Sequence, residues 1–229
     1  MKQYFVTGTD TEVGKTYVTC HLLRAASNAK LKSVGYKPIA AGCELVEGEW
    51  INEDAANIQK ASGLALPISD INPIALMPPI APHIAAQEAG VSLTQASIEK
   101  GLRHLESHQP DFLLMEGAGG WRLPLSIGNQ NTPTYYLSDV VKALKMDVIL
   151  VVGMRLGCLN HALLTAEAIR ADGLTIKGWV ANDVTGNMSR YQENLASLRD
   201  MLPEPLLAEI PYQSQPADKV LQRAIEQLC

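Results

Sequence analysis

Apolar residues along the chain gather into short runs, and longer stretches with helical periodicity separate these runs. The runs span residues 4–7, 33–36, 112–115, 148–153, 178–181 and 206–210. Runs that are apolar almost throughout are typical of strands buried on both faces of a sheet. Residues 16–28 instead carry apolar side chains at helical spacing. The alternation predicts a mostly parallel central sheet with helices on both faces and right-handed crossovers.

Length and composition fit one domain of this kind. The chain has 229 residues, 47% of them hydrophobic, so we expect a single P-loop α/β domain over residues 1–229. A net charge of −5 argues against nucleic acid or anionic membrane as partners. The four cysteines form no close pair, which favours reduced thiols and a cytoplasmic location. No apolar run approaches the ~20 residues of a membrane span.

Residues 8–16, which follow the first predicted strand, have the character of a phosphate-binding loop. The segment reads Gly-Thr-Asp-Thr-Glu-Val-Gly-Lys-Thr and leads into the predicted helix. Unpaired amides at a helix start attract anions, and Lys15 adds ~4 kcal/mol against an anion at 4 Å for an effective dielectric of 20. Five residues separate Gly8 from Gly14, one more than in the common P-loop. An ordinary glycine turn is the alternative, and the Gly-Lys-Thr triplet argues against it.

Charged residues at the ends of two other strands are candidates for the same site, since ligands bind beyond the carboxyl ends of parallel strands. Glu116 ends the strand at 112–115, and glycines follow it, which suits a carboxylate beside nucleotide-bound Mg²⁺. Lys37 directly follows the strand at 33–36 and is either a surface lysine or a second cation facing the phosphoryl group. Asp54 is a helix-cap residue or a further Mg²⁺ ligand. The proline-rich segment 72–82 is a rigid connection or a wall over a pocket.

Six segments of the chain together resemble dethiobiotin synthetases. They are residues 4–16, 35–38, 82–83, 116–121, 157–162 and 178–183, in the family's order. The first segment has the family's own longer P-loop. The resemblance implies a P-loop fold, ATP as co-substrate and Mg²⁺. It also implies that 7,8-diaminononanoate takes up CO₂ as a carbamate, which ATP phosphorylates to a mixed anhydride. Attack by the second amine then closes a ureido ring.

The same resemblance assigns roles to individual residues. Lys15, Lys37 and Thr11 would act on the reacting groups, and Thr16, Asp54 and Glu116 would bind Mg²⁺. Nucleotide contacts would come from Glu12, Val13, Gly14, Lys15, Thr16, Tyr17, Asp54, Glu116, Gly117, Ala118, Gly119, Asn182, Asp183, Pro211, Tyr212 and Gln213.

Family members are homodimers with a shared substrate site, so a second copy of the chain is an expected partner. The substrate contacts would then be Ala41, Gly157, Cys158, Leu159, Asn160 and Tyr191. The family usually has serine at the position of Ala41. One lost neutral hydrogen bond costs only ~0.5–1.5 kcal/mol, which lowers affinity without abolishing function.

Three other classes of protein with a P-loop fit these residues less well. A partitioning or positioning ATPase of the deviant Walker type would carry an extra lysine early in the loop, where this chain has Asp10, Thr11 and Glu12. An amidoligase with a glutaminase domain would need a longer chain. An idle nucleotide-binding scaffold would not need Lys15, Lys37 and the three Mg²⁺ ligands. A short apolar stripe at 220–228 is expected to pack on the sheet.

Overall fold

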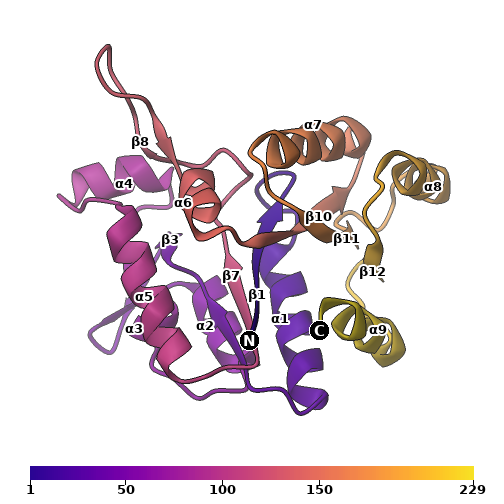
Figure 1. Cartoon of the computed structure of the whole chain (residues 1–229), viewed down its shortest axis with the longest axis horizontal. Helices are drawn as coiled ribbons and strands as arrows, with labels where there is room; N and C mark the ends of the chain where they lie inside the picture. Colours follow the sequence, from indigo (N-terminus) through magenta and orange to yellow (C-terminus); the bar gives the residue numbers. More distant parts are fainter.

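The computed structural model describes all residues, 1–229, and a six-stranded parallel sheet forms its centre (Figure 1). The strands are β1 (Lys2–Gly8), β2 (Ser33–Tyr36), β7 (Phe112–Glu116), β10 (Asp147–Met154), β11 (Ile176–Asp183) and β12 (Leu206–Ile210). Their order across the sheet is β12-β11-β10-β1-β7-β2. All six strands predicted from the apolar runs are confirmed, and β1 lies between β7 and β10 near the middle of the sheet.

Helices cover both faces of this sheet. They are α1 (Lys15–Asn28), α2 (Glu53–Ala61), α3 (Ile68–Ile71), α4 (Pro82–Glu88), α5 (Gln95–Ser107), α6 (Leu137–Leu144), α7 (Cys158–Ala171), α8 (Tyr191–Met201) and α9 (Asp218–Leu228). Helix α1 packs against α2 and α9, whereas α7 and α8 lie together across the sheet (Figure 1). Two adjacent residues of β2 show how closely the helices on each face approach the sheet. A Cβ on Gly35 would lie 2.2 Å from Ile58 of α2, and Tyr36 on the other face donates to the Ile98 carbonyl of α5.

Three small two-stranded sheets lie outside the central one and were not predicted. Strands β3 (Ile39–Ala41) and β6 (Ile74–Leu76) pair in parallel, whereas β4 (Glu44–Val46) pairs antiparallel with β5 (Glu49–Ile51). Strands β8 (Pro124–Ser126) and β9 (Tyr135–Tyr136) form a hairpin that projects from the body (Figure 1). Each of these six strands has three residues or fewer, which is too short to give a periodic pattern in the sequence.

The two ends of the chain meet on the molecule's lower side in Figure 1. The Tyr4 hydroxyl of β1 donates to the Leu228 carbonyl of α9. As the apolar stripe predicts, Leu221, Ala224 and Ile225 of α9 are buried. None of the helices combines the length and the apolar character that crossing a membrane requires.

Candidate functional site

The loop between β1 and α1 has the conformation that a phosphate site needs. Gly14 precedes α1 with φ of 80°, a left-handed conformation that favours glycine. A Cβ on Gly14 would lie 2.2 Å from Nδ2 of Asn182, which itself donates to the Val13 carbonyl at 2.8 Å. Helix α1 has no side-chain cap, so its first amides remain available for an anion.

Lys15 is buried within this loop, and its Nζ donates to the Asp10 carbonyl at 3.1 Å. The pKa of Lys15 is lowered to about 8, mainly by burial; the negative charge of Glu116 opposes this shift, and the positive charge of Lys37 adds to it. The ammonium is therefore poorly solvated and gains strongly from a bound anion.

Lys37, Asp54, Glu116 and Thr16 converge at the carboxyl ends of β2 and β7. Lys37 Nζ lies 2.6 Å from Glu116 Oε1 and 3.1 Å from Asp54 Oδ2. The Thr16 hydroxyl donates to the same Glu116 oxygen at 2.7 Å. From sequence, Lys37 is either a surface lysine or a cation that faces the phosphoryl group. In the structure its side chain is buried and is joined to both carboxylates predicted to bind Mg²⁺. Burial alone would lower the pKa of Lys37, but attraction to Glu116 and Asp54 outweighs it and raises the pKa.

The backbone of Lys37 is held as firmly as its ammonium. Its amide donates to the Ile71 carbonyl at 2.8 Å, and its carbonyl accepts from Nδ2 of Asn72 at 2.7 Å. Both contacts come from the end of α3, and the Asn72 side chain is buried. Two fixed backbone contacts limit the positions that the ammonium can reach.

The residues present fit a Mg²⁺ ion. Glu116 is fully buried, yet its Oε2 atom has no hydrogen-bond partner. A buried carboxylate oxygen without a partner is costly, and a cation would satisfy it. The Thr16 hydroxyl and the half-exposed Asp54 carboxylate add hard oxygen donors of the kind Mg²⁺ prefers.

A cavity of about 1110 Å³ opens beside these groups. Its wall includes Thr11, Glu12, Gly14, Lys15, Thr16, Tyr17, Lys37, Asp54, Ala118 and Gly119 from the predicted site. Ala41 lines it as well, and so do residues 79–82. The proline-rich segment therefore forms a pocket wall as well as leading into α4. Asn52, which sequence reasoning missed, also lines the cavity and donates to the Ala41 carbonyl at 3.1 Å.

The residues predicted to bind the base lie at the end of β11 and in the loop after β12. Asp183 accepts from the amides of Thr185 and Gly186, so its carboxylate caps the turn after β11. Asn182 braces the phosphate loop through Val13. Beyond β12, Pro211 leads into Tyr212 and Gln213, whose side chains are joined by a 3.0 Å hydrogen bond. The nearby Tyr17 hydroxyl donates to the Ser214 carbonyl at 3.1 Å, so this loop is tied to α1.

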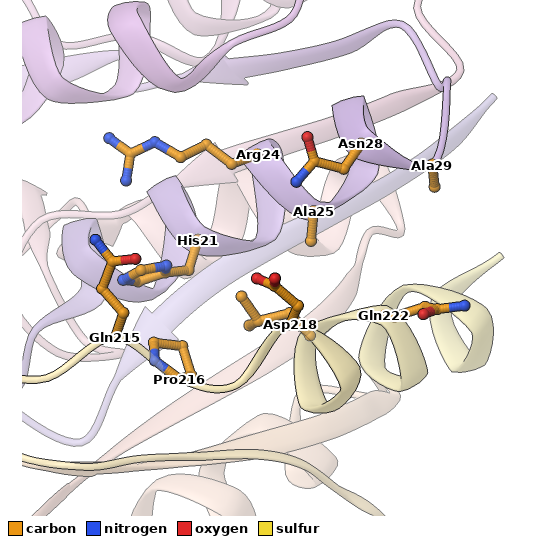
Figure 2. Close-up of a pocket in the computed structure, with 10 residues that line it drawn as sticks. His21, Arg24, Ala25, Asn28, Ala29, Gln215, Pro216, Asp218 and Gln222 are labelled. Carbon is orange, nitrogen blue, oxygen red and sulfur yellow. The ribbon is translucent and has the colours of Figure 1, made fainter.

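A second cavity of about 700 Å³ lies between α1 and the segment that leads into α9 (Figure 2). His21 of α1 lies beside Gln215 in the cavity wall, whereas the Arg24 side chain extends away from that segment (Figure 2). Arg24 also lines the larger cavity, so one guanidinium borders both. Sequence reasoning missed Arg24, because a single arginine on a helix carries no motif.

The residues predicted to reach a second subunit lie away from the charged cluster. Gly157 begins α7 with φ of 95°. Around it, Leu156 is 95% exposed, Asn160 is exposed and Cys158 is buried. Gly157, Cys158, Leu159, Asn160 and Tyr191 are all absent from the lining of the larger cavity. The Tyr191 hydroxyl is buried, where burial and then Glu209 raise its pKa.

Comparison with known proteins identifies the family. A model described as "AAA domain" matches residues 2–219. The "ATP-dependent dethiobiotin synthetase BioD" of Alteromonas mediterranea is 77% identical over the whole of both chains. The protein of the same name from Pseudomonas aeruginosa is 50% identical over 92% of this chain and 90% of its own. The chain belongs to the dethiobiotin synthetase family. The resemblance drawn from the six sequence segments is thus confirmed.

Solved structures place this dethiobiotin synthetase chain among P-loop proteins by fold alone. A ParA family ATPase from Chlorobium tepidum is 14% identical, with a TM-score of 0.54 over 99% of this chain and 90% of its own. MinD, in its complex with MinC from Aquifex aeolicus, is 12% identical, with a TM-score of 0.56 over 98% and 86%. The fold class predicted from sequence is confirmed. Identity this low gives no support to the partitioning-ATPase alternative, whereas identity to the synthetases is high.

Proposed function

We propose that this chain is a dethiobiotin synthase, which uses ATP and CO₂ to close the ureido ring on 7,8-diaminononanoate. The observation that carries the proposal is that two buried lysines and Asp54 line one cavity beside a phosphate loop, where Lys37 is bonded both to Asp54 and to the fully buried Glu116. A switch ATPase needs only the loop and a metal site. The additional buried cation, Lys37, is what a reaction that joins an anionic carbamate to a phosphoryl group requires.

In this reaction the loop residues bind and orient ATP. Amides at the start of α1 would hold the phosphates, and the Lys15 ammonium would exchange its Asp10 carbonyl for a phosphate oxygen. Mg²⁺, when bound by Thr16, Asp54 and Glu116, would neutralise charge on the phosphates. Thr11 lines the same cavity, within the region where the transferred group would lie.

Lys37 is paired with Asp54 and Glu116, and its ammonium would exchange these partners when ATP and the substrate bind. Its ammonium, buried beside Asp54 and Glu116, would bind the carbamate and the transferring phosphoryl group as these anions enter the site. The backbone contacts to Ile71 and Asn72 would keep it within a short distance of both. Once the ligands are bound, an ammonium held in place stabilises the transition state without further reorganisation at the moment of reaction.

The substrate would lie along the wall formed by Ala41 and residues 79–82. Pro79, Ile80, Ala81 and Pro82 suit an alkyl chain, whereas the diamine end would face Lys37. A second copy of the chain would supply amides from Gly157 to Asn160 for the carboxylate of the substrate. The exposed Leu156 and Leu164 near that segment support an apolar contact between subunits, and we propose a cytoplasmic homodimer.

The decisive experiment is mass detection of a cyclic urea formed from the diamine, bicarbonate and ATP, together with one ADP and one phosphate per ring. Omission of the diamine should abolish ATP hydrolysis. A hydrolysis rate that is equal with and without diamine, and no cyclic product, would support the switch ATPase instead. Light scattering of the active species tests the dimer separately.

A further inference from the structure

A cluster of three metal-ligating side chains lies outside both cavities. Asp70 of α3 faces His104 and His108 at the end of α5, and one ligand atom from each side chain lies within 4.8 Å of the others. None of the three lines either cavity described above. We propose that Asp70, His104 and His108 form a binding site for a transition-metal ion of the zinc class, which fastens α3 to α5.

The two histidines have the spacing that a helix-borne metal site uses. Residues four apart lie one above the other on a helix face. His108, the residue after α5, keeps helical dihedral angles with φ of −80°. The imidazole centroids are accordingly 5.2 Å apart. Neutral imidazoles with one carboxylate are a ligand set that Zn²⁺ takes readily, whereas Mg²⁺ prefers oxygen ligands alone.

The separation of the ligand atoms also fits. Two ligands bound tetrahedrally to zinc at 2.0–2.2 Å lie about 3.3–3.6 Å from each other. Nε2 of His104 is 3.1 Å from Oδ2 of Asp70. The ligand atom of His108 lies within 4.8 Å of the other two, and the His108 side chain would move closer to bind the same ion. Both histidines are exposed, so water can fill the remaining position, and the arrangement suits a structural clamp.

The clamp would act on the segment that positions Lys37. Asp70 directly precedes Ile71 and Asn72, which hold the Lys37 amide and carbonyl. Helix α5 is itself fixed to β2, since Tyr36 donates to the Ile98 carbonyl at 2.8 Å, and α3 lies beside α5 (Figure 1). A bound ion would therefore restrict motion of α3 away from β2.

Calorimetric titration with ZnCl₂ tests the site on metal-stripped, nucleotide-free protein. Every variant carries Cys229→Ser, because that thiol is exposed. We expect one site in the parent and in His161→Ala, which removes a helix histidine outside the cluster. His104→Ala and His108→Ala should each weaken binding at least ~100-fold, beyond the 10–100-fold typical of an outer-shell loss. Asp70→Asn should weaken it by about 10–100-fold. The proposal would be overturned if a variant with both His104→Ala and His108→Ala kept the parental affinity for zinc, or if the parent bound no zinc at millimolar concentration.

Hydrogen exchange separates a clamp from simple surface binding. Zinc should slow exchange in the peptide that contains Lys37, whose amide bonds to Ile71, and should not do so in His104→Ala. Binding that leaves this exchange unchanged would refute the clamp. Neither measurement uses ATP or the diamine, so the result is independent of the proposed reaction.

Discussion

Two ionic clusters in this molecule contrast in how completely their charges are paired. Around Glu116, a lysine and a threonine share one carboxylate oxygen, and the other oxygen is buried with no partner. Around Asp172, Oδ2 accepts from the Trp121 indole at 2.8 Å and lies 2.6 Å from Arg122, and Oδ1 lies 3.4 Å from Lys142. The second cluster is complete as it stands, whereas the first lacks a partner that a ligand can supply. Incomplete pairing of buried charge therefore distinguishes the reactive end of the sheet from a structural tie.

Lys37→Ala should give the largest effect on turnover. We expect kcat to fall by roughly 10²–10³, as when one preorganised donor to a transition state is removed. Lys142→Ala, which removes a cation from the complete cluster, is the matched control and should leave kcat within twofold. Initial rates of ring formation at saturating substrates measure both variants. Near-normal turnover in Lys37→Ala would remove the proposed role.

Asp172→Asn should reduce stability without changing kcat. The carboxylate is 9% exposed, and losing charged hydrogen bonds to Trp121 and Arg122 should cost about 1–3 kcal/mol of unfolding free energy. Urea denaturation followed by tryptophan fluorescence measures the difference. A variant with parental stability would show that the Asp172 cluster contributes nothing to folding.

The contribution of Asp172 should also depend on pH. Burial alone would raise the pKa of this carboxyl, but hydrogen bonds from Arg122 and Trp121 outweigh it and lower the pKa below the usual value. The unfolded chain then binds more protons than the folded one as the pH approaches 4, so the stability from Asp172 is present above that value and is lost as pH falls. The difference between parent and Asp172→Asn should be constant from pH 7 to 5 and shrink toward pH 3. A difference that grows on acidification would reverse the assigned sign.

Ala41→Ser should give the smallest effect. A serine hydroxyl at this cavity position can add one hydrogen bond to the substrate, worth ~0.5–1.5 kcal/mol, or about tenfold in affinity at most. We expect a lower KM for the diamine and an unchanged KM for ATP. If only the KM for ATP changed, residue 41 would not be in contact with the diamine. Steady-state titration of each substrate distinguishes these outcomes.

The sequence predicted the central strands because each run is apolar almost throughout, and this feature depends only on local residues. The phosphate loop at 8–16 was also predictable, because its motif lies within one continuous segment. The contacts of Lys37 with Asp54 and Glu116 could not be read from the chain, since they join residues 17 and 79 positions apart. The support of its backbone by Asn72 is likewise long-range. Arg24 and Asn52 carry no motif, and only the packing of α1 and α2 brings them to the cavity.

The hydrogen bond between Tyr4 and Leu228 brings the two ends of the chain together, so the chain is suited to circular permutation. Because the first strand and the last helix already touch, a short linker could join residue 229 to residue 1. New ends could be opened at the exposed Glu47–Gly48 turn between β4 and β5, where few contacts would be interrupted. Such a permuted chain would keep the sheet order and leave the phosphate loop in the interior of the sequence.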